Sequence, residues 1–276
     1  MKLILCPTDF SKGSENAVLY AAAMARIYKS KLLLMHCYET PVIYTDVTIS
    51  SVQIDYQVMY ENSIKALKKF YAKIAEKLKG VQVELIIQQG LPSARALEIA
   101  IEKKVDAIFL SSTTTSSVER FLIGSNTGRI LKEATCPVMI IPPKAKFTDF
   151  KKIVYTTDLT EENLLKSDKV VELAKMFRAE MIFLNVDNHF LVHDEKDLER
   201  ITSRIKQFVK YPKMRGYVCS DANIADGITF FLKSEKVDCL AMATHHRNFL
   251  ESLINPSITK RVAYKTDLPM FIINVD

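Results

Sequence analysis

Small polar residues at two points of this chain could bind an anion. Asp9 follows an apolar run over residues 2–7, and Gly124-Ser125 immediately precedes a short amphipathic segment. A loop that leaves the carboxyl end of a parallel strand and enters a helix offers unpaired backbone N–H groups and the positive end of the helix dipole. The spacing therefore predicts a phosphate-binding loop within residues 105–143, between one buried strand and the next.

The chain lacks the common sequence signatures of nucleotide-dependent and hydrolytic enzymes. No two of its 7 glycines are separated by a single residue, and none begins a Walker A loop, so a Rossmann fingerprint and a P-loop are both absent. It also contains no G-x-S-x-G elbow, no H-E-x-x-H and no kinase signature. Nothing in the spacing of Ser125, His36 and Asp9 supports a catalytic triad. We therefore predict no catalytic residues and, because no thiol or carboxylate lies at ligand spacing from the histidines, no metal site.

The elements that would position these residues alternate along the first half. Apolar runs predict strands at 2–7, 31–37, 81–88, from Val105 onward and at 138–141. Helical periodicity predicts helices at 14–28, 55–79, 94–103 and 125–133, with a loop at 38–54. A strand, a helix and a strand within forty residues indicate a βαβ unit, and hence a parallel sheet with right-handed crossovers.

The same order of elements begins again after Pro142-Pro143, which cannot continue a central strand. The predicted strands of the second half are 152–155, 180–186, 215–219, 237–243 and 270–275, and the predicted helices are 161–177, 194–210, 224–233 and 256–264. Asp158 then aligns with Asp9, and Ser257 with Ser125. This internal repeat predicts two domains, residues 1–143 and 144–276.

Composition narrows the class of protein. With 276 residues, 48% hydrophobic and 25% charged, the chain is long enough for two globular domains. The net charge of +6 is spread evenly, so nucleic-acid binding is not indicated. No apolar run is long enough to span a membrane, and Pro7 and Asp9 interrupt the first run before a signal-peptide core is complete. The 5 cysteines form no C-x-x-C, which is typical of reduced core thiols in a cytoplasmic protein.

Several separated blocks resemble the universal stress protein family. They are LILCPTDFS at the start, LMHC at the end of the second predicted strand, Gly90-Leu91-Pro92, and VERFLIGSNTGRILKEATCPVMII. Together with the repeat, they make nearly the whole chain similar to a tandem member. The resemblance implies an α/β fold of two tandem doubly wound, mainly parallel five-stranded sheets flanked by helices, as in the adenine nucleotide alpha hydrolases.

The resemblance also implies a nucleotide site. Family members that bind ATP carry a loop G-x2-G-x9-G-S/T after the fourth strand, an Asp near the ribose and phosphates, and backbone after the second strand that meets adenine. In this sequence the loop reads Ser111-x2-Thr114-x9-Gly124-Ser125. Side chains at the first two loop positions occupy space through which phosphate would reach backbone N–H groups. The implied nucleotide-binding residues are Pro7, Thr8, Asp9, Cys37, Ser111, Thr114, Gly124, Ser125 and Asn126.

The second half departs further from that loop. Its equivalent positions read Ala243-x2-His246-x9-Pro256-Ser257. His246 is bulky, and Pro256 has no N–H to donate. We expect the second domain to bind ATP poorly or not at all.

The resemblance thus implies a cytoplasmic stress-response protein whose first domain binds ATP with magnesium. It would act as a binding or signalling module, with at most slow ATP hydrolysis. The alternative is a nucleotide-free interaction scaffold, which the Ser111 and Thr114 replacements favour. In it, Asp9 serves only the turn or caps a helix, and Ser125 is only an N-cap. The last strands of the two halves are expected to pair, so that the two domains form an internal pseudo-dimer. Whether two whole chains also associate as a homodimer is left undecided by the sequence. Neither nucleic acid nor a membrane is an expected partner.

Overall fold

The computed structural model describes residues 1–39, 56–114, 121–122, 124–187, 195–244 and 268–274. The strands of the first half are β1 (Leu3–Pro7), β2 (Lys31–Tyr38), β3 (Gln82–Gln89), β4 (Ala107–Ser111) and β7 (Val138–Ile141). Its helices are α1 (Lys12–Tyr28), α2 (Tyr56–Ile74), the 3-10 turn η1 (Ala75–Leu78), α3 (Pro92–Glu102) and α4 (Ser125–Glu133). Two short strands, β5 (Thr113–Thr114) and β6 (Phe121–Leu122), form a separate antiparallel pair.

The second half repeats this order. Its strands are β8 (Lys152–Thr156), β9 (Glu180–Asp187), β10 (Met214–Ser220), β11 (Cys239–Thr244) and β12 (Met270–Asn274). Its helices are α5 (Glu161–Leu165), α6 (Asp168–Phe177), α7 (Glu195–Phe208) and α8 (Ile224–Ser234). The predicted helix 256–264 and most of the predicted loop 38–54 lie outside the described residues.

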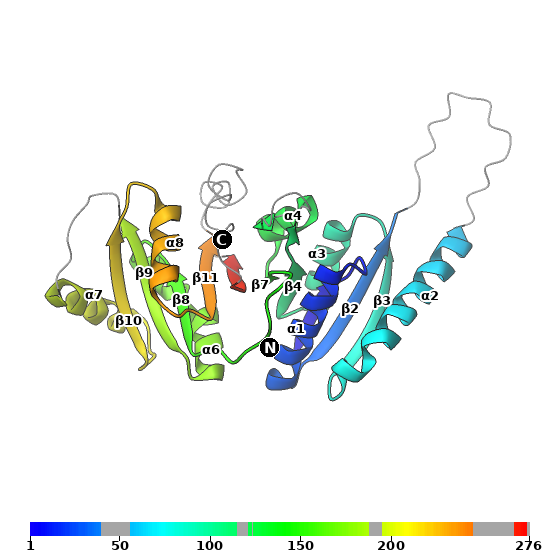
Figure 1. The fold of residues 1–276 in the computed structure, drawn as a ribbon, viewed down its shortest axis with the longest axis horizontal. Coiled ribbons are helices and arrows are strands. Elements are labelled where there is room, and N and C mark those ends of the chain that lie inside the picture. The colour runs from blue at the N-terminus through cyan, green and yellow to red at the C-terminus, as the bar shows by residue number, and fades with distance from the viewer. Residues whose placement is uncertain (40–55, 115–120, 123, 188–194, 245–267, 275–276) are drawn as a thin grey trace, which may run out of the picture.

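All these strands except β5 and β6 form one 10-stranded sheet in the order β10-β9-β8-β11-β12-β7-β4-β1-β2-β3. Pairing is parallel within each half, and the halves meet where β7 and β12 pair antiparallel, with Met139 opposite Phe271. The prediction of two tandem, doubly wound five-stranded halves is confirmed, and the structure adds that they share one continuous sheet. The arrowheads of β2 and β9 point to the same side of the molecule (Figure 1).

Alternating side chains of the strands build one apolar layer on each face of the sheet. In β2, for example, Leu32 and Leu34 face one layer, whereas Leu33 and Met35 face the other. Helices α1, α2, α6 and α7 cover the first layer, and α3, α4 and α8 cover the second. Each layer runs through both halves, so the β7–β12 junction lies within a shared core.

The prediction of a single helix over residues 161–177 is wrong. The structure has two helices there, α5 and α6, separated at Lys166 and Ser167. The buried Ser167 donates both its hydroxyl, at 2.6 Å, and its backbone N–H, at 3.2 Å, to the carbonyl of Leu164. These bonds close a tighter turn than an α-helix allows and so end α5.

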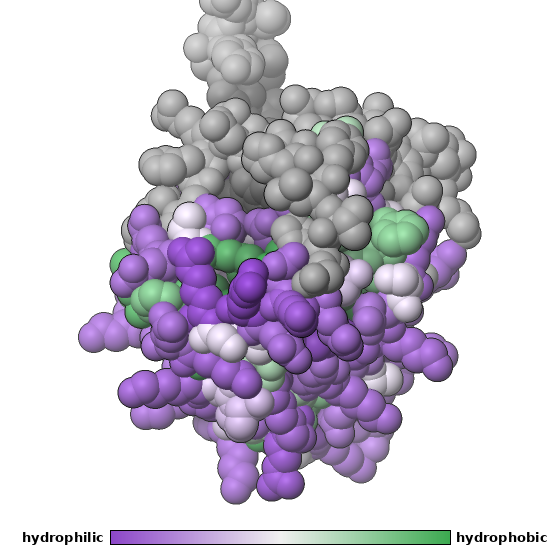
Figure 2. Space-filling view, turned by 90° about the vertical axis from the view of Figure 1, so that its left-hand side faces the viewer, coloured by the Kyte–Doolittle hydropathy of each residue, from purple (hydrophilic) through white to green (hydrophobic). Residues whose placement is uncertain are grey.

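The surface and the thiols agree with a globular protein. Figure 2 shows that the face at the β10 end of the sheet is mostly hydrophilic, with apolar residues scattered among charged ones. Among the described helices, none combines the length and the apolar character needed to cross a bilayer. All five cysteines are free in the structure.

Candidate functional site

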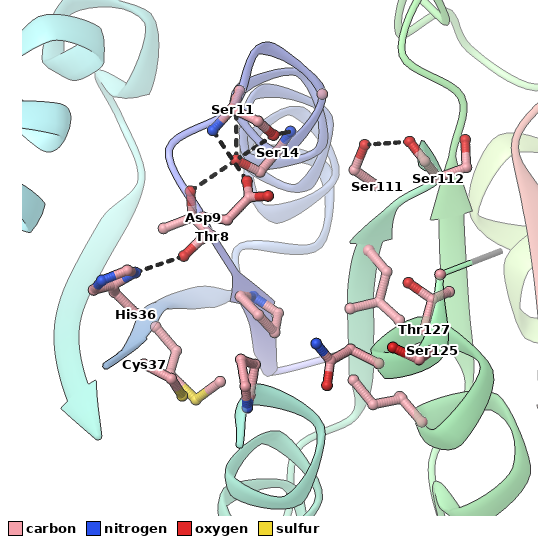
Figure 3. Close-up of a pocket in the computed structure, with 18 of the residues that line it drawn as sticks. Thr8, Asp9, Ser11, Ser14, His36, Cys37, Ser111, Ser112, Ser125 and Thr127 are labelled. Atoms are coloured by element: carbon pink, nitrogen blue, oxygen red, sulfur yellow. Dashed lines mark hydrogen bonds between the residues drawn. The ribbon is translucent and has the colours of Figure 1, made fainter. Parts of the chain in front are cut away.

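A cavity of about 490 Å³ opens at the carboxyl ends of β1 and β4. This is where the strand order of the first half reverses, the usual ligand position in a doubly wound sheet. Figure 3 shows residues from the ends of β1, β2 and β4 and from the starts of α1 and α4 around one space. The predicted site residues that line it are Pro7, Thr8, Asp9, Cys37, Ser111, Gly124, Ser125 and Asn126. The ninth, Thr114, lies in β5, and its side chain is outside the described part of the structure.

Asp9 occupies a tight turn between β1 and α1. Its Oδ1 accepts a hydrogen bond from the backbone N–H of Ser11 at 3.0 Å, and Ser11 in turn caps α1 by accepting from the N–H of Ser14 at 3.1 Å. Partial burial raises the pKa of Asp9, but hydrogen bonds from Ser11 and Ser14 outweigh it and hold the pKa below its ordinary value. Asp9 is therefore a carboxylate at neutral pH and accepts hydrogen bonds, whether from the turn or from a ligand.

Phe10 holds this turn in an unusual conformation. Its φ of 65° is left-handed, which costs a bulky residue about 1–3 kcal/mol. The ring of Phe10 packs at a tilt against His36, with centroids 4.2 Å apart, and against Phe70 at 5.3 Å. These ring contacts stabilise Phe10 in its left-handed conformation and so offset the strain.

The buried Thr8 ties the turn to β2. Its N–H donates to the carbonyl of Met35 at 2.8 Å, and its hydroxyl accepts from the N–H of Phe10 at 3.0 Å. The carbonyl of Thr8 lies 2.8 Å from Nδ1 of His36. Because a carbonyl only accepts, Nδ1 of His36 is the donor in this bond.

The N-terminus of α4 faces the cavity without a side-chain cap. Gly124 is the N-cap in extended conformation, and the first helical hydrogen bond runs from the N–H of Gly128 to its carbonyl at 2.8 Å. The N–H groups of Ser125, Asn126 and Thr127 precede that bond, and no acidic residue lies in this first turn. The alternative that Ser125 is only the N-cap is wrong, since Ser125 is the first helical residue. This end of the helix can bind an anion.

Ser111 is directed toward α1. Its hydroxyl donates to the carbonyl of Ser112 at 2.9 Å. A Cβ added to Gly13 would lie 2.6 Å from that same hydroxyl oxygen. The side chain that replaces the first loop glycine therefore fills the space above Gly13, in the first turn of α1.

Sequence reasoning missed much of the cavity wall. Lys12 and Gly13 lie in the first turn of the helix that follows Asp9, and this position in the sequence could have identified them. Lys12 is the one lysine or arginine among the described lining residues. The lining residues not predicted are Ser11, Lys12, Gly13, Ser14, Met35, His36, Pro92, Leu110, Ser112, Thr127, Ile130 and Pro143.

The reactive groups of the wall suit binding more than covalent chemistry. Burial raises the pKa of Cys37 to about 11, while Arg95 lowers it and Glu39 raises it by smaller amounts. The thiol is therefore protonated at neutral pH. Nδ1 of His36 bonds a carbonyl rather than Asp9. Within the described ranges, no three His, Cys, Asp or Glu side chains gather as a metal site would require.

The second half repeats the turn with a smaller cavity of about 250 Å³. Leu159 has a φ of 60°, the N–H of Thr157 donates to the carbonyl of Leu184 at 3.0 Å, and Asn185 Nδ2 donates to the carbonyl of Thr157 at 3.0 Å. The φ of Leu159 corresponds to that of Phe10, and the two hydrogen bonds of Thr157 correspond to those that Thr8 makes with Met35 and His36. The turn is thus common to both halves, whereas the size of the cavity is not.

Comparison with known proteins agrees with this repeated architecture. A model of the universal stress protein family matches residues 1–142 and, a second time, residues 149–274. The chain belongs to the universal stress protein family. Its tandem organisation is thereby confirmed, and the boundary predicted at residues 143 and 144 stays a prediction, with residues 143–148 between the two matches.

Similar family members match one half or the whole of the chain. The universal stress protein MJ0531 of Methanocaldococcus jannaschii is 29% identical over 145 residues, which cover 52% of this chain and 84% of that protein. A universal stress protein of Thermus aquaticus is 28% identical over 144 residues, covering 51% and 98%. The crystal structure of a universal stress protein from Archaeoglobus fulgidus covers 99% of this chain and 96% of its own, with 16% identity and a TM-score of 0.74. That likeness shows that both halves have the family fold.

Proposed function

We propose that the first domain of this stress-response protein binds an adenine nucleotide, ATP with magnesium, and that the chain acts in the cytoplasm as a binding or signalling module. The observation that carries the proposal is the joining of the Asp9 turn and the uncapped N-terminus of α4 in one cavity. Its volume of about 490 Å³ lies within the roughly 300–1,000 Å³ of ligand pockets.

The polarity of the wall suits a nucleotide. The N–H groups at the start of α4 and the ammonium of Lys12 provide donors and positive charge for phosphates. Asp9 provides an acceptor for ribose hydroxyls, and Pro7, Met35 and Cys37 provide apolar surface for a base. Magnesium would enter with the phosphates, which commonly supply most of its ligands alongside one or two carboxylates.

The position of Ser111 bears on the main objection to this function. A side chain in place of the first loop glycine was expected to obstruct phosphate. Because the hydroxyl of Ser111 lies against Gly13 and bonds the carbonyl of Ser112, the start of α4 stays part of the cavity wall. The nucleotide-free scaffold is the competing proposal, and Thr114, whose side chain is not described, is the residue that still favours it.

Titration of the purified full-length protein with a fluorescent ATP analogue in magnesium buffer tests the proposal. We expect one site per chain, and Asp9→Ala should weaken binding by about 10- to 100-fold, because a charge-assisted hydrogen bond contributes about 1.5–3 kcal/mol. Asp158→Ala, the matched change in the second half, should leave this affinity unaltered. No binding at millimolar nucleotide would support the scaffold instead, and equal effects of the two substitutions would contradict the assignment of the site to the first domain.

A further inference from the structure

The segment that connects the two halves forms part of the wall of the first cavity. Pro143 lines this cavity, although it follows β7 and lies between the two domains. Strand β7 ends at Ile141, whose carbonyl accepts from the N–H of Ser112, another lining residue, at 3.1 Å. The connection therefore enters the cavity wall where it leaves the sheet.

A tight turn over residues 142–145 presents Pro143 to the cavity. The N–H of Ala145 donates to the carbonyl of Pro142 at 3.0 Å, which closes a β-turn with Pro143 at its second position. Proline suits this position because its ring fixes φ near the value that the turn requires. The turn thus has a defined shape of its own, and the position of Pro143 depends on what anchors the turn to the domain.

Asn16 anchors this turn to α1. Its Nδ2 donates to the carbonyl of Pro142 at 3.0 Å and to that of Ala145 at 2.9 Å, so one amide group bonds the turn on both sides of Pro143. Because carbonyls only accept, the orientation of the amide is fixed by chemistry. Asn16 is not among the described lining residues of the cavity, whereas residues 12–14 of the same helix are.

Beyond the turn, the connection packs on both halves. The ring of Phe147 meets Tyr20 of α1 edge-on, with centroids 5.0 Å apart, and lies at a tilt 6.3 Å from Phe177 of α6. Phe150, which is buried, lies 4.7 Å from the same ring of Phe177. Figure 1 shows this segment running from the side of α1 to α6. Direct contacts therefore lead from the cavity wall through the connection to the second half.

We propose that Asn16 is a positioning residue for the nucleotide cavity, which holds the turn so that Pro143 completes the wall against which a ligand packs. The inference rests on the nucleotide site proposed above. Without the amide, the turn keeps its own hydrogen bond but loses both bonds to α1. Because Ala145 is buried, its carbonyl then finds another donor only if the turn moves toward water. Pro143 would leave the wall in that movement, and a ligand that needs the complete wall would bind more weakly.

Asn16→Leu is the substitution that tests this role. Leucine has the branching of asparagine but no hydrogen-bond donor. The repeat indicates that the helix accepts it, because Leu165 follows Asp158 by seven residues, as Asn16 follows Asp9. The change therefore removes both bonds to the turn without placing a new charge near the cavity.

Asn185→Leu is the matched control in the second half. Asn185 Nδ2 donates to the carbonyl of Thr157 at 3.0 Å, so the substitution removes a bond of the same kind far from the connection in the sequence. Both full-length variants are titrated with a fluorescent ATP analogue in magnesium buffer. We expect Asn16→Leu to weaken binding by about two- to tenfold, as when the wall is complete in about 10–50% of the molecules, and Asn185→Leu to leave the affinity unaltered. Unaltered affinity in Asn16→Leu, or equal losses in the two variants, would overturn the proposal.

Hydrogen exchange over residues 142–150, followed by mass spectrometry, supplies a measurement that a general loss of stability does not reproduce. In the nucleotide-free protein, Asn16→Leu should speed exchange in this segment by about tenfold and leave β9 unchanged. Nucleotide should slow exchange in this segment of the wild type, and less so in Asn16→Leu. Failure of the wild type to bind nucleotide would refute the nucleotide site itself. Unchanged exchange in nucleotide-free Asn16→Leu would refute the anchoring of the turn, whether or not nucleotide binds.

Discussion

Replacing Gly13 with alanine should destabilise the protein but stabilise its Ser111→Ala variant. The new Cβ would lie 2.6 Å from the hydroxyl oxygen of Ser111, too close for any real contact. That hydroxyl can move away only by giving up its 2.9 Å bond to the carbonyl of Ser112. The backbone of Gly13 is helical, so alanine itself brings no strain there.

The magnitudes decide the sign. Crowding costs about 1–3 kcal/mol and the lost hydrogen bond about 1 kcal/mol, against a gain in helix propensity of at most about 1 kcal/mol. We expect a net loss of about 1–3 kcal/mol for Gly13→Ala in the wild-type background. Without the Ser111 hydroxyl, the closest remaining Ser111 atom, its Cβ, lies at an ordinary 3.7 Å, and the same change should gain up to about 1 kcal/mol.

Urea unfolding of the wild type, both single variants and the double variant measures this coupling. The chain has no tryptophan, so far-UV circular dichroism is the suitable signal. The four midpoints, read at a common slope, should give a coupling free energy of about 2–4 kcal/mol. A coupling below about 0.5 kcal/mol would refute the reasoning, because the hydroxyl of Ser111 would then not occupy the space above Gly13.

Three further predictions follow from individual contacts. Asp106→Ala should lower the free energy of unfolding by about 1–3 kcal/mol in urea titrations, because Asp106 Oδ2 accepts from the N–H groups of Lys2 and Leu3 at 2.6 and 2.8 Å; an unchanged midpoint would contradict this. In the folded state the hydrogen bond from Lys152 lowers the pKa of Glu235, and this effect outweighs partial burial, which raises it. The ionised Glu235 therefore stabilises the fold above the unfolded pKa of about 4.5, and this stabilisation is lost as the pH falls through the folded pKa. Glu235→Gln should accordingly flatten the acid limb of a curve of unfolding free energy against pH. The pKa of Cys37 is raised to about 11, so its thiol should react with iodoacetamide at pH 7.5 about a hundredfold more slowly than a thiol with the ordinary pKa of 9.0. Mass spectrometry follows the reaction, and a rate equal to that of the unfolded chain would contradict the burial of Cys37.

The strands and the repeated turn could be predicted because local sequence determines them. A continuous apolar run such as Lys31–Tyr38 has few alternatives to a strand buried on both faces. Asp9 and Asp158 both follow such a strand and both precede a helix. Since carboxyl ends of neighbouring parallel strands meet at one edge, residues from four separate elements were predicted to surround one site, and eight of the nine do.

The parts that could not be predicted depend on contacts between distant residues or on side-chain geometry. The break at Ser167 arises from a buried hydroxyl that bonds a carbonyl three residues earlier, which helical periodicity does not register. The space shared by Gly13 and Ser111 joins residues far apart in the chain. The role of His36 requires knowing that its ring lies against the Thr8 carbonyl.

The antiparallel pairing of β7 with β12 has a consequence for how the two sites can diverge. When identical chains associate, every substitution appears in both subunits, so neither site can change alone. Here both halves belong to one polypeptide, and their junction does not weaken on dilution. Each half can accumulate its own substitutions while the other half maintains the assembly, so the two cavities of one chain can come to differ in size and lining, as they do here.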